Sequence, residues 1–440
     1  MIKLQKGGEM NMLLASEYVI CDTYGILNET SKQANNLFNA CLYQVRQNFF
    51  QREPMKPYEF YNALFKQKYE ARENMLYRAL GYVQSAQQTL KEVLEIWLAW
   101  RKALKEYYNN PKKFTGKPRM PKYLKKGSRH TFFVTNQNAK VKNGYLVIDK
   151  LKVRVKLIET IGKVKRVAFK PLSKNFFKMI VQHEIPDVLP KTDNGIVMGI
   201  DPGLDNLFTC VTNTKNRPLI INGKGLKSVN QWYNKQRSAL YAKHATYGQC
   251  CKQVKQKDGK VAIAYYESKK TRELTDWRNR KMKDFAHKAT KRIIDYALSC
   301  GVTTIVIGHN KRQKNKSNMG TQNNQNFITI PHVMMMDMLE YKATLAGITV
   351  IRTEESYTSQ TSFLDNELPI KENGNHARKL KGLKPAKRRL KRGLFKSDKG
   401  ILINADVNGA LQIIKKVFPE MQLDGIVGMV LFPVKYNVQF

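Results

Sequence analysis

The sequence predicts a chain of mixed architecture, in which all-α and all-β parts precede an α/β sheet. Three observations support this fold class: residues 26–110 carry apolar side chains at helical spacing, residues 131–187 alternate apolar and polar side chains, and the chain from residue 196 returns repeatedly to short apolar strands separated by helices. A repeat of 3.6 residues indicates helix and a repeat of two indicates strand. A chain of 440 residues is long enough for two or three domains with cores of their own.

The charge of the chain indicates a polyanionic partner. Lys and Arg number 77 against 35 Asp and Glu, which gives a formal net charge of +42. Such an excess repels itself in a compact protein unless a polyanion offsets it, and each nucleic-acid phosphate that is neutralised releases a counterion. A membrane is the less favoured alternative, because no apolar run reaches membrane-spanning length and the N-terminus has no apolar signal core. We expect a nucleic-acid-binding, nucleoid-associated protein of the cytoplasm.

The cysteines predict no zinc site. No two of the six form a C-x-x-C pair, and adjacent cysteines cannot easily share one ion, so reduced thiols in a cytoplasm are expected. The six are Cys21, Cys41, Cys210, Cys250, Cys251 and Cys300.

The N-terminal part divides at residue 25. Residues 1–25 are expected to form an N-terminal extension and a first strand, and residues 26–110 a helical domain. The run Lys-Gly-Gly-Glu-Met at 6–10 can be encoded by a purine-rich sequence like a bacterial ribosome-binding site, so we expect a bacterial or phage source and a natural start at Met10 or Met12.

A basic segment, residues 112–129, follows the helices. It holds eight Lys or Arg and no acid, with Gly116, Pro118 and Pro121 spaced through it. One interpretation is a solvated linker. The other is an extended chain that contacts a nucleic-acid backbone, since aromatic and basic side chains alternate in such surfaces. The candidates for that contact are Lys117, Arg119, Lys122 and Tyr123.

Residues 131–187 predict a small β-barrel, so that the β part with its basic segment spans residues 111–190. Asn143-Gly144 between two strand-like runs is a strong signal for a hairpin. In the run 151–157, apolar and basic residues alternate, which places Lys152 and Arg154 on the outer face. Such a face often serves solubility alone. In a chain of this charge, contact with backbone phosphates is the second interpretation.

The order of elements after residue 191 predicts an RNase H-like α/β domain over residues 191–440. An apolar strand at 196–201 ends in Asp-Pro-Gly, and two further strands precede a long helical stretch at 224–299 that is interrupted near 248–259. A strand, a helix, a strand and a final helix at 404–417 follow. Three strands, a helix, a strand–helix–strand unit and a last helix form the RNase H-like order.

Asp201 and Asp406 are the candidate catalytic carboxylates of this domain. A phosphodiester nuclease of this architecture clusters carboxylates around two divalent cations, which prefer oxygen ligands, at the carboxyl ends of neighbouring strands. Asp201 ends the first strand and Asp406 begins the last helix. Each alone has a simpler explanation, in turn chemistry or in the helix dipole. Their joint occurrence on these elements favours the catalytic interpretation.

Four motifs resemble the TnpB family, the transposon-encoded nucleases from which type V CRISPR effectors descend. They are GKPRMPKY at 116–123, GIDPG at 199–203, YTSQTS at 357–362 and NADVNGA at 404–410. The resemblance implies a wedge barrel with an inserted helical recognition domain and a RuvC nuclease domain. It also implies a guide RNA from the transposon end and a double-stranded DNA target, cut beside a short target-adjacent motif with two Mg²⁺ ions, or Mn²⁺ in their place. In such systems base pairing reads the target sequence.

The chain departs from the family pattern at the third carboxylate. Relatives carry a Glu at the end of the strand that here reads Ile305 to Gly308, and Gly308 leaves that position without a side chain. Glu354 and Glu355 end the next strand, and adjacent strands lie about 4.8 Å apart. Alternate residues face opposite ways, so one of the two can reach the metals. Glu355 is the prediction and Glu354 the alternate.

A second departure concerns the zinc knuckle that many relatives carry. Ser362 stands where its first Cys is expected, and residues 363–403 contain no Cys. Residues 371–399 instead hold twelve Lys or Arg and two acids. We therefore predict no zinc and a basic loop over 363–403 that contacts nucleic-acid phosphates. Its candidate residues are Lys387, Arg388, Arg389, Lys391 and Arg392.

Three functions compete for this sequence. The first is an active RNA-guided DNA endonuclease, a metal-dependent phosphodiester hydrolase. The second is a nuclease-inactive descendant that binds guide RNA and target DNA and represses transcription. A transposase that moves DNA ends is the third. The survival of Asp201, Asp406 and a replacement Glu favours the endonuclease.

Overall fold

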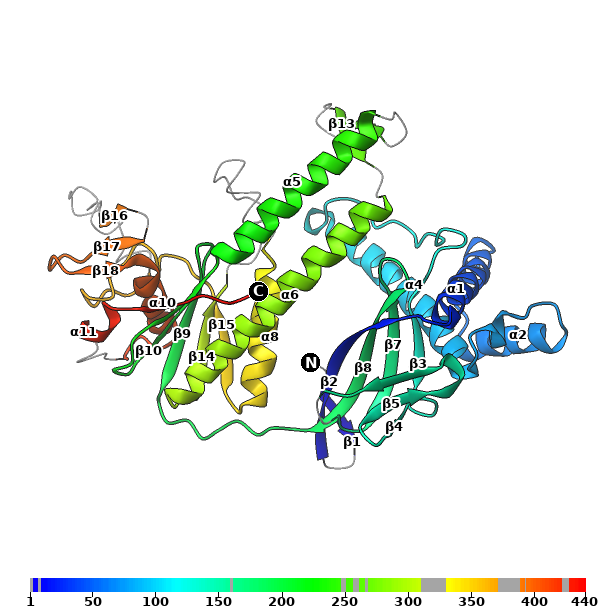
Figure 1. Cartoon of the computed structure of the whole chain (residues 1–440), viewed down its shortest axis with the longest axis horizontal. Coiled ribbons are helices and arrows are strands. Elements are labelled where there is room, and N and C mark those ends of the chain that lie inside the picture. The colour runs from blue at the N-terminus through cyan, green and yellow to red at the C-terminus, as the bar shows by residue number, and fades with distance from the viewer. Residues whose placement is uncertain are drawn as a thin grey trace. The chain divides into compact units, whose positions relative to one another are not determined.

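The structure is a computed structural model, and it divides into two compact units, Met1–Asp187 and Val188–Phe440 (Figure 1). The predicted contact residues Lys387 and Arg392 lie outside the described part of the chain. The residues described are 3–6, 9–158, 161–246, 251–255, 261–265, 268–309, 330–370, 388–391, 393–421 and 427–440.

The first unit contains the predicted β-structure as two sheets. An antiparallel sheet has the strand order β1-β2-β8-β7-β3, and a smaller one has the order β4-β5-β6. Asn143 and Gly144 have φ angles of 48° and 74° and turn the chain between β4 and β5, as the sequence predicts. The strands are β1 (Lys3–Lys6), β2 (Glu9–Cys21), β3 (Phe132–Thr135), β4 (Lys140–Lys142), β5 (Tyr145–Ile148), β6 (Val153–Lys156), β7 (Val164–Pro171) and β8 (Phe176–Pro186).

The helices between β2 and β3 share one hydrophobic core with these sheets. Buried side chains of the helices, such as Leu37 and Trp97, belong to the same cluster as Phe132 and Phe169 of the sheet. Trp97 is 2% exposed and packs against Trp100, so this pair serves the core. These elements are α1 (Ile26–Phe50), α2 (Tyr58–Glu70), α3 (Leu76–Ala79), α4 (Val83–Asn109) and η1 (Pro111–Lys113), and a further short helix, η2 (Asp149–Leu151), lies between β5 and β6.

The second unit is built on one mixed sheet with the strand order β15-β14-β9-β10-β11-β19. β9 pairs antiparallel with β10 and parallel with β14, and β14 pairs parallel with β15. The carboxyl ends of β9, β14 and β15 therefore share one edge of the sheet. The strands are β9 (Val197–Pro202), β10 (Asn206–Thr212), β11 (Leu219–Asn222), β14 (Thr304–Gly308), β15 (Thr349–Thr353) and β19 (Val434–Tyr436).

Helices cover both faces of this sheet. Side chains of α6 (Lys269–Ser299) and α8 (His332–Leu345) share a core with Met198 and Ile305. On the other face, Ile413 and Ile414 of α10 (Ala405–Val417) pack on Val197 and Val306. Successive residues of β9 face opposite sides of the sheet, so Met198 packs on the side of α6 and α8, whereas Val197 and every second residue after it face α10.

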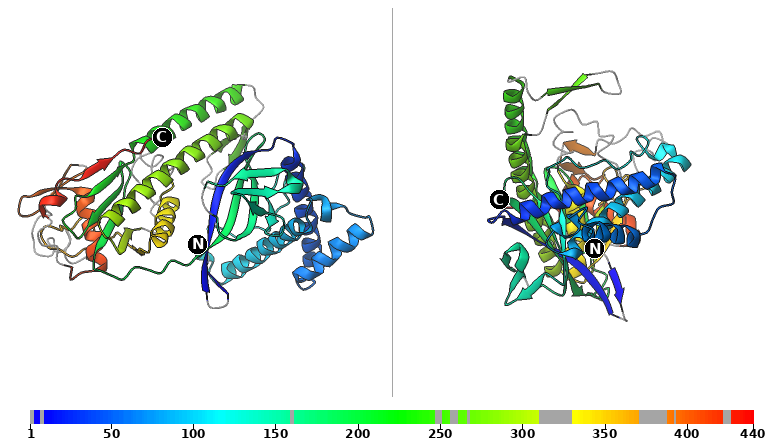
Figure 2. Two further views of the ribbon diagram at one scale, coloured as in Figure 1. Left: turned by 60° about the horizontal axis from the view of Figure 1, so that its bottom comes forward. Right: turned by 90° about the vertical axis from the view of Figure 1, so that its right-hand side faces the viewer.

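The long helical stretch of the sequence forms two helices joined by a hairpin. α5 (Lys224–Thr246) and α6 lie side by side, and β12 (Cys251–Lys255) pairs antiparallel with β13 (Val261–Tyr265) at their far end (Figures 1 and 2). Among the described residues, no helix is both long enough and apolar enough to cross a bilayer.

The sequence predicts a basic loop over residues 363–403, and this prediction is wrong for the last part of that range. β16 (Arg389–Lys391), β17 (Leu394–Lys396) and β18 (Leu402–Asn404) form a three-stranded antiparallel sheet. Phe395 and Ile403 are buried with Val407 and Leu411 of α10. Alternate residues of these short strands therefore supply core contacts, while the cations between them stay outside. A short helix, α11 (Val427–Val430), precedes β19.

Candidate active site

Two glycines bring Asp201 against helix α10. In β9, Val197, Gly199 and Asp201 face α10, because alternate residues share one side of a strand. A β-carbon at Gly199 would lie 2.3 Å from the carbonyl oxygen of Ala410, and one at Gly409 would lie 2.7 Å from Oδ2 of Asp201. Only glycine allows so close an approach of strand, helix and carboxylate.

Asp406 lies in the first turn of α10, where the side chain of Asn404 caps the helix. Asn404 Oδ1 accepts hydrogen bonds from the backbone N–H groups of Asp406 and Val407 at 2.9 and 3.3 Å. Asn206, at the start of β10, donates from Nδ2 to Asp406 Oδ2 at 2.7 Å. The cap fixes the backbone of Asp406, and Asn206 fixes the orientation of its carboxylate.

The side chain of Glu355 occupies the space beside Gly308. A β-carbon at Gly308 would lie 2.7 Å from Cγ and 2.8 Å from Oε1 of Glu355. Gly308 pairs with Thr353 in the parallel strand β15, two residues before this glutamate. Glu354 is exposed, and its Oε1 accepts a hydrogen bond from Ser356 Oγ at 2.5 Å. The structure thus places Glu355, and not Glu354, beside the end of β14.

The carboxylates act on one another electrostatically. Burial raises the pKa of Asp201 well above its usual value, the charges of Glu355 and Asp406 raise it further, and Arg389 opposes them. Burial raises the pKa of Glu355 to about 7, against the influence of Lys416. The charges of Glu355 and Asp406 thus disfavour the charged form of Asp201, and a cation bound beside it would favour that form.

The donor chemistry of these residues fits a hard divalent cation. Three carboxylates from the sheet edge and α10 offer only oxygen ligands, as Mg²⁺ prefers. Within the residues that the structure describes, no three His, Cys, Asp or Glu side chains converge on a single ion position. A pair of ions would share the three carboxylates between two positions. The metal prediction for Asp201, Glu355 and Asp406 stays a prediction.

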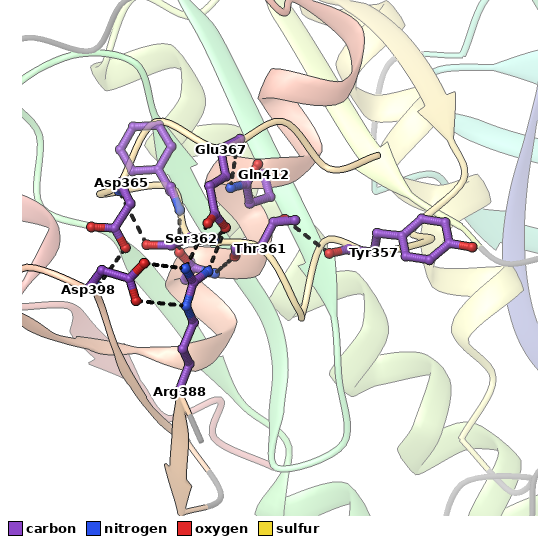
Figure 3. A network of polar contacts seen from close by, with 10 residues as sticks. Tyr357, Thr361, Ser362, Asp365, Glu367, Arg388, Asp398 and Gln412 are labelled. Carbon is purple, nitrogen blue, oxygen red and sulfur yellow. Dashed lines mark hydrogen bonds and ion pairs between the residues drawn. The ribbon is translucent and has the colours of Figure 1, made fainter. Parts of the chain in front are cut away.

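The residues after Glu355 form a loop that is fixed by buried polar contacts (Figure 3). In this glutamate loop, residues 354–367, Glu367 accepts hydrogen bonds from Arg388 Nη1 and Nη2 at 2.6 and 2.7 Å and from the backbone N–H of Ser362 at 2.8 Å. Arg388 also donates to Asp398 from Nε and Nη2, at 3.2 and 2.7 Å. The end of the glutamate loop is thereby joined to the β16–β17 sheet.

The contacts of Arg388 therefore correct the prediction that this residue binds nucleic acid. Its side chain is 8% exposed, and its guanidinium is shared between two carboxylates. A buried guanidinium with two carboxylate partners offers little to a phosphate. The neighbours Arg389 and Lys391 are exposed, and Arg389 is the cation that acts on Asp201.

The basic segment is not a free linker, because α1 holds its backbone. Asn39 accepts from the N–H of Leu124 at 2.8 Å and donates to its carbonyl oxygen at 3.0 Å. Asn35 is fully buried and donates to the carbonyl oxygens of Lys125 and Ser128 at 3.0 and 2.8 Å. The side-chain amides of these asparagines supply the hydrogen-bond partners that a helix or a sheet would otherwise give to the backbone of the segment.

The predicted contact residues of the first unit point outward. Lys117, Arg119, Lys122 and Tyr123 are exposed. The ammonium of Lys117 lies 5.3 Å from the ring centre of Tyr108, and the guanidinium of Arg46 lies 4.8 Å from that of Tyr123. The two rings thus have cations beside them, which suits contact with bases and phosphates.

Lys152 and Arg154 are exposed too, and each lies over an aromatic ring. The Lys152 ammonium is 4.9 Å from the ring centre of Tyr24, and the Arg154 guanidinium is 4.7 Å from that of Tyr145. Lys152 has a φ of 50° in the turn before β6 and is not part of the strand. Arg154 stands on the outer face, as the alternation predicts.

The sequence analysis missed Asn206, Lys416 and the two glycines at 199 and 409. A glycine inside a strand, or within the first turns of a helix, signals a close backbone approach, so Gly199 and Gly409 could have been found. Asn206 and Asp406 are 200 residues apart in the chain. No local pattern connects them.

Fold and site together define an α/β protein with carboxylates at one sheet edge and a strongly basic surface. Its fold is shared with a solved Cas12f1–sgRNA–target DNA complex, which is 16% identical over 88% of this chain and 82% of that chain, at a TM-score of 0.50. A CRISPR-Cas12f ternary complex also matches, with 16% identity over 88% and 80% of the two chains and a TM-score of 0.35. At 16% identity, the likeness to the first of these structures shows the fold alone.

Two family models match consecutive parts of the chain. A model described as a probable transposase, OrfB of IS605, covers residues 180–314, and the Cas12f1-like TNB domain covers residues 332–413. No curated protein matches the chain. Both matches are consistent with the resemblance to the TnpB family that the motifs of the sequence carry.

Proposed function

We propose that this protein is an RNA-guided DNA endonuclease of a transposon, which cleaves double-stranded DNA beside a short target-adjacent motif. The observation that carries the proposal is the placement of Glu355 in the space left by Gly308, on the side of the sheet that Asp201 and α10 share. A chain that had lost cleavage would have no need of a buried carboxylate there, because burial disfavours its charged form.

The proposed nuclease domain is of the RuvC type with an RNase H-like sheet. The strand order β11-β10-β9-β14-β15, with β10 antiparallel to its neighbours, supports this proposal. It brings the ends of β9, β14 and β15 to one edge, which is where ligands bind in open α/β sheets. We propose this domain for the second unit, and the wedge barrel with its recognition helices for the first.

Asp201, Glu355 and Asp406 would hold two Mg²⁺ ions, or Mn²⁺ in their place. When bound, such ions lower the pKa of an attacking water and stabilise the leaving oxygen of the phosphodiester. Asn206 keeps the Asp406 carboxylate in place through its 2.7 Å hydrogen bond. Arg389, exposed at the β16 edge and close enough to act on Asp201, would orient the anionic DNA backbone.

The partners proposed are a guide RNA from the transposon end and a double-stranded DNA target. The net charge of +42 and the cation–aromatic pairs at Tyr108 and Tyr123 support contact with phosphates and bases. The structurally similar Cas12f1 is a complex with sgRNA and target DNA. We therefore propose guided recognition, in which base pairing selects the target.

The alternative is a nuclease-inactive repressor that binds guide RNA and target DNA. One observation favours it: among the described residues, the carboxylates do not converge on one ion position. The two functions differ in a single outcome, which is cleavage of a bound target.

The test is guided cleavage of a target-plasmid library by the protein purified with its co-expressed RNA. If the protein is an endonuclease, we expect cuts beside one short motif. These cuts should require Mg²⁺ and should be absent with Asp406→Asn. RNA binding and target binding without any cut, at all Mg²⁺ concentrations, would favour the repressor. If no RNA copurifies, or if cuts ignore the RNA sequence, guided recognition is wrong.

A further inference from the structure

One face of helix α10 carries polar side chains that contact the glutamate loop and its continuation. The spacing of these residues, four, three and one apart, places them on one side of a helix. Lys416 Nζ donates to the carbonyl oxygen of Ser356 at 3.1 Å, and Gln412 Nε2 donates to that of Glu367 at 3.1 Å. The four are Asn408, Gln412, Lys415 and Lys416.

The contacts of Asn408 and Lys415 complete this polar face. Asn408 Oδ1 accepts from the N–H of Phe363 at 2.9 Å, and its Nδ2 donates to the carbonyl oxygen of Thr361 at 2.9 Å. Lys415 Nζ donates to Asn366 Oδ1. Most of these hydrogen bonds go to the backbone of the glutamate loop. They therefore depend on the path of its backbone and little on its side chains.

Burial makes this arrangement specific. Asn408 and Gln412 are fully buried and Lys415 is 3% exposed. A polar group buried without partners costs free energy, and an apolar side chain would avoid that cost. A loop displaced along α10 would leave several buried groups unpaired together. The polar face therefore sets the register of the loop against the helix that carries Asp406.

We infer that Lys416 is a positioning residue that holds Glu355 against Gly308 and Asp201, within the nuclease site proposed above. Its bond to the Ser356 carbonyl lies one residue beyond Glu355, at the end of the loop nearest the carboxylates. The far end of the loop is held separately, because Arg388 and Gln412 both bind Glu367. Losing Lys416 would free the Glu355 end and leave the rest of the loop attached.

This separation makes the inference testable without unfolding the protein. Lys416 is half-buried, and its methylene chain is matched in size by methionine. Lys416→Met removes the donor and the charge, and Lys416→Arg keeps both. Lys415→Met, next to it, removes an equal charge and a contact with Asn366, at the end of the loop that Arg388 and Gln412 also hold, and serves as the control for charge.

The first measurement is Mn²⁺ binding to the free protein, followed by electron paramagnetic resonance of the unbound ion. We expect Lys416→Met to weaken binding roughly 10–100-fold, the range found when a residue that orients metal ligands is removed. Lys416→Arg should bind within a few-fold of wild type, and so should Lys415→Met. Equal loss in Lys415→Met and Lys416→Met would show a general charge effect and overturn the inference.

The second measurement is guided cleavage as a function of Mg²⁺ concentration. Lys416→Met should need more Mg²⁺ for half-maximal cleavage while it binds guide RNA and target DNA as tightly as wild type. Wild-type Mg²⁺ dependence in Lys416→Met, with Asp406→Asn inactive, would overturn the role of Lys416 alone. Full cleavage by Asp406→Asn would instead overturn the proposed nuclease site.

Discussion

Two irregular segments of this protein are held by the same device and serve different ends. In the basic segment, Asn39 of α1 pairs with both the N–H and the carbonyl of Leu124. In the glutamate loop, Asn408 of α10 pairs with the N–H of Phe363 and the carbonyl of Thr361. In both cases an asparagine on a helix supplies the hydrogen bonds that a neighbouring strand would otherwise give.

The difference lies in the direction of the functional side chains. Lys117, Arg119 and Lys122 of the basic segment point outward to solvent, whereas Glu355 of the glutamate loop points inward to Gly308. An outward charge costs little and meets a partner by diffusion, but an inward carboxylate is buried at a cost that a bound cation would offset. We therefore expect binding and cleavage to depend on separate segments, so that substitutions separate them.

The largest effect is expected at the two aspartates. Asp201→Asn and Asp406→Asn each remove a negative ligand and should lower guided cleavage on the order of 10³-fold or more, since the ions contribute several kcal/mol of transition-state stabilisation. Binding of guide RNA and target DNA should not weaken. Rate measurements at saturating complex, with filter binding beside them, check both. Normal cleavage by either variant would contradict the proposed site.

Arg388→Met is expected to destabilise the second unit by about 1–3 kcal/mol. It removes the buried partner of Glu367 and Asp398, which are 20% and 41% exposed, so water offsets part of the roughly 3–5 kcal/mol that breaking a fully buried ion pair costs. Denaturant unfolding measures the loss. Lys391→Met, on the same strand and exposed, is the control and should change stability little. Equal stabilities of the two variants would show that the ion pairs of Arg388 do not stabilise the second unit.

Alanine substitutions of Asn39 and Asn408 test whether the basic segment and the glutamate loop act separately. Asn39→Ala and Asn408→Ala each leave a backbone N–H and carbonyl without a partner, which costs about 1–3 kcal/mol of stability for each buried group at Asn408 and less at the part-buried Asn39. We expect Asn39→Ala to weaken RNA binding with cleavage of the bound target unchanged. Asn408→Ala should do the reverse. If both variants lose binding and cleavage together, the two segments do not act separately.

The smallest effect is expected from the outward cations. Changing Lys117, Arg119 and Lys122 together to Gln should weaken RNA binding modestly and lower the slope of log affinity against log salt by about 2, because each phosphate contact contributes about 0.7–0.9. Titrations over a range of salt concentrations measure it. Lys140 and Lys142, which are exposed on β4, provide a control that removes two charges outside the basic segment. An unchanged slope would show the basic segment to be only solvated.

The sequence predicted the elements whose signals are local. Asp201 lies at the end of an apolar strand and precedes Pro-Gly, and Asn404 caps a helix with Asp406 in its first turn, so both positions could be assigned from a few neighbouring residues. The turn at Asn143-Gly144 was predictable for the same reason. The prediction that one of Glu354 and Glu355 reaches the site followed from strand alternation and the missing side chain at Gly308, two facts that are also readable in the sequence.

What the sequence did not reveal depends on contacts between distant residues. Arg388 looks like its neighbours in a run of cations, and only Glu367 and Asp398 make it a buried ion pair. The strands β16–β18 are three residues each, too short for a period to show among charges. Lys416 is one of two adjacent lysines, and the loop it contacts is 60 residues earlier in the chain.

The most direct test of the central claim is guided cleavage by Glu355→Ala, Glu354→Ala and the double variant Gly308→Glu with Glu355→Ala. We predict that Glu355→Ala loses cleavage on the order of 10³-fold while Glu354→Ala keeps it. The double variant should recover part of the rate, because a glutamate at 308 would fill the space that Glu355 leaves. Wild-type cleavage by Glu355→Ala would contradict the account.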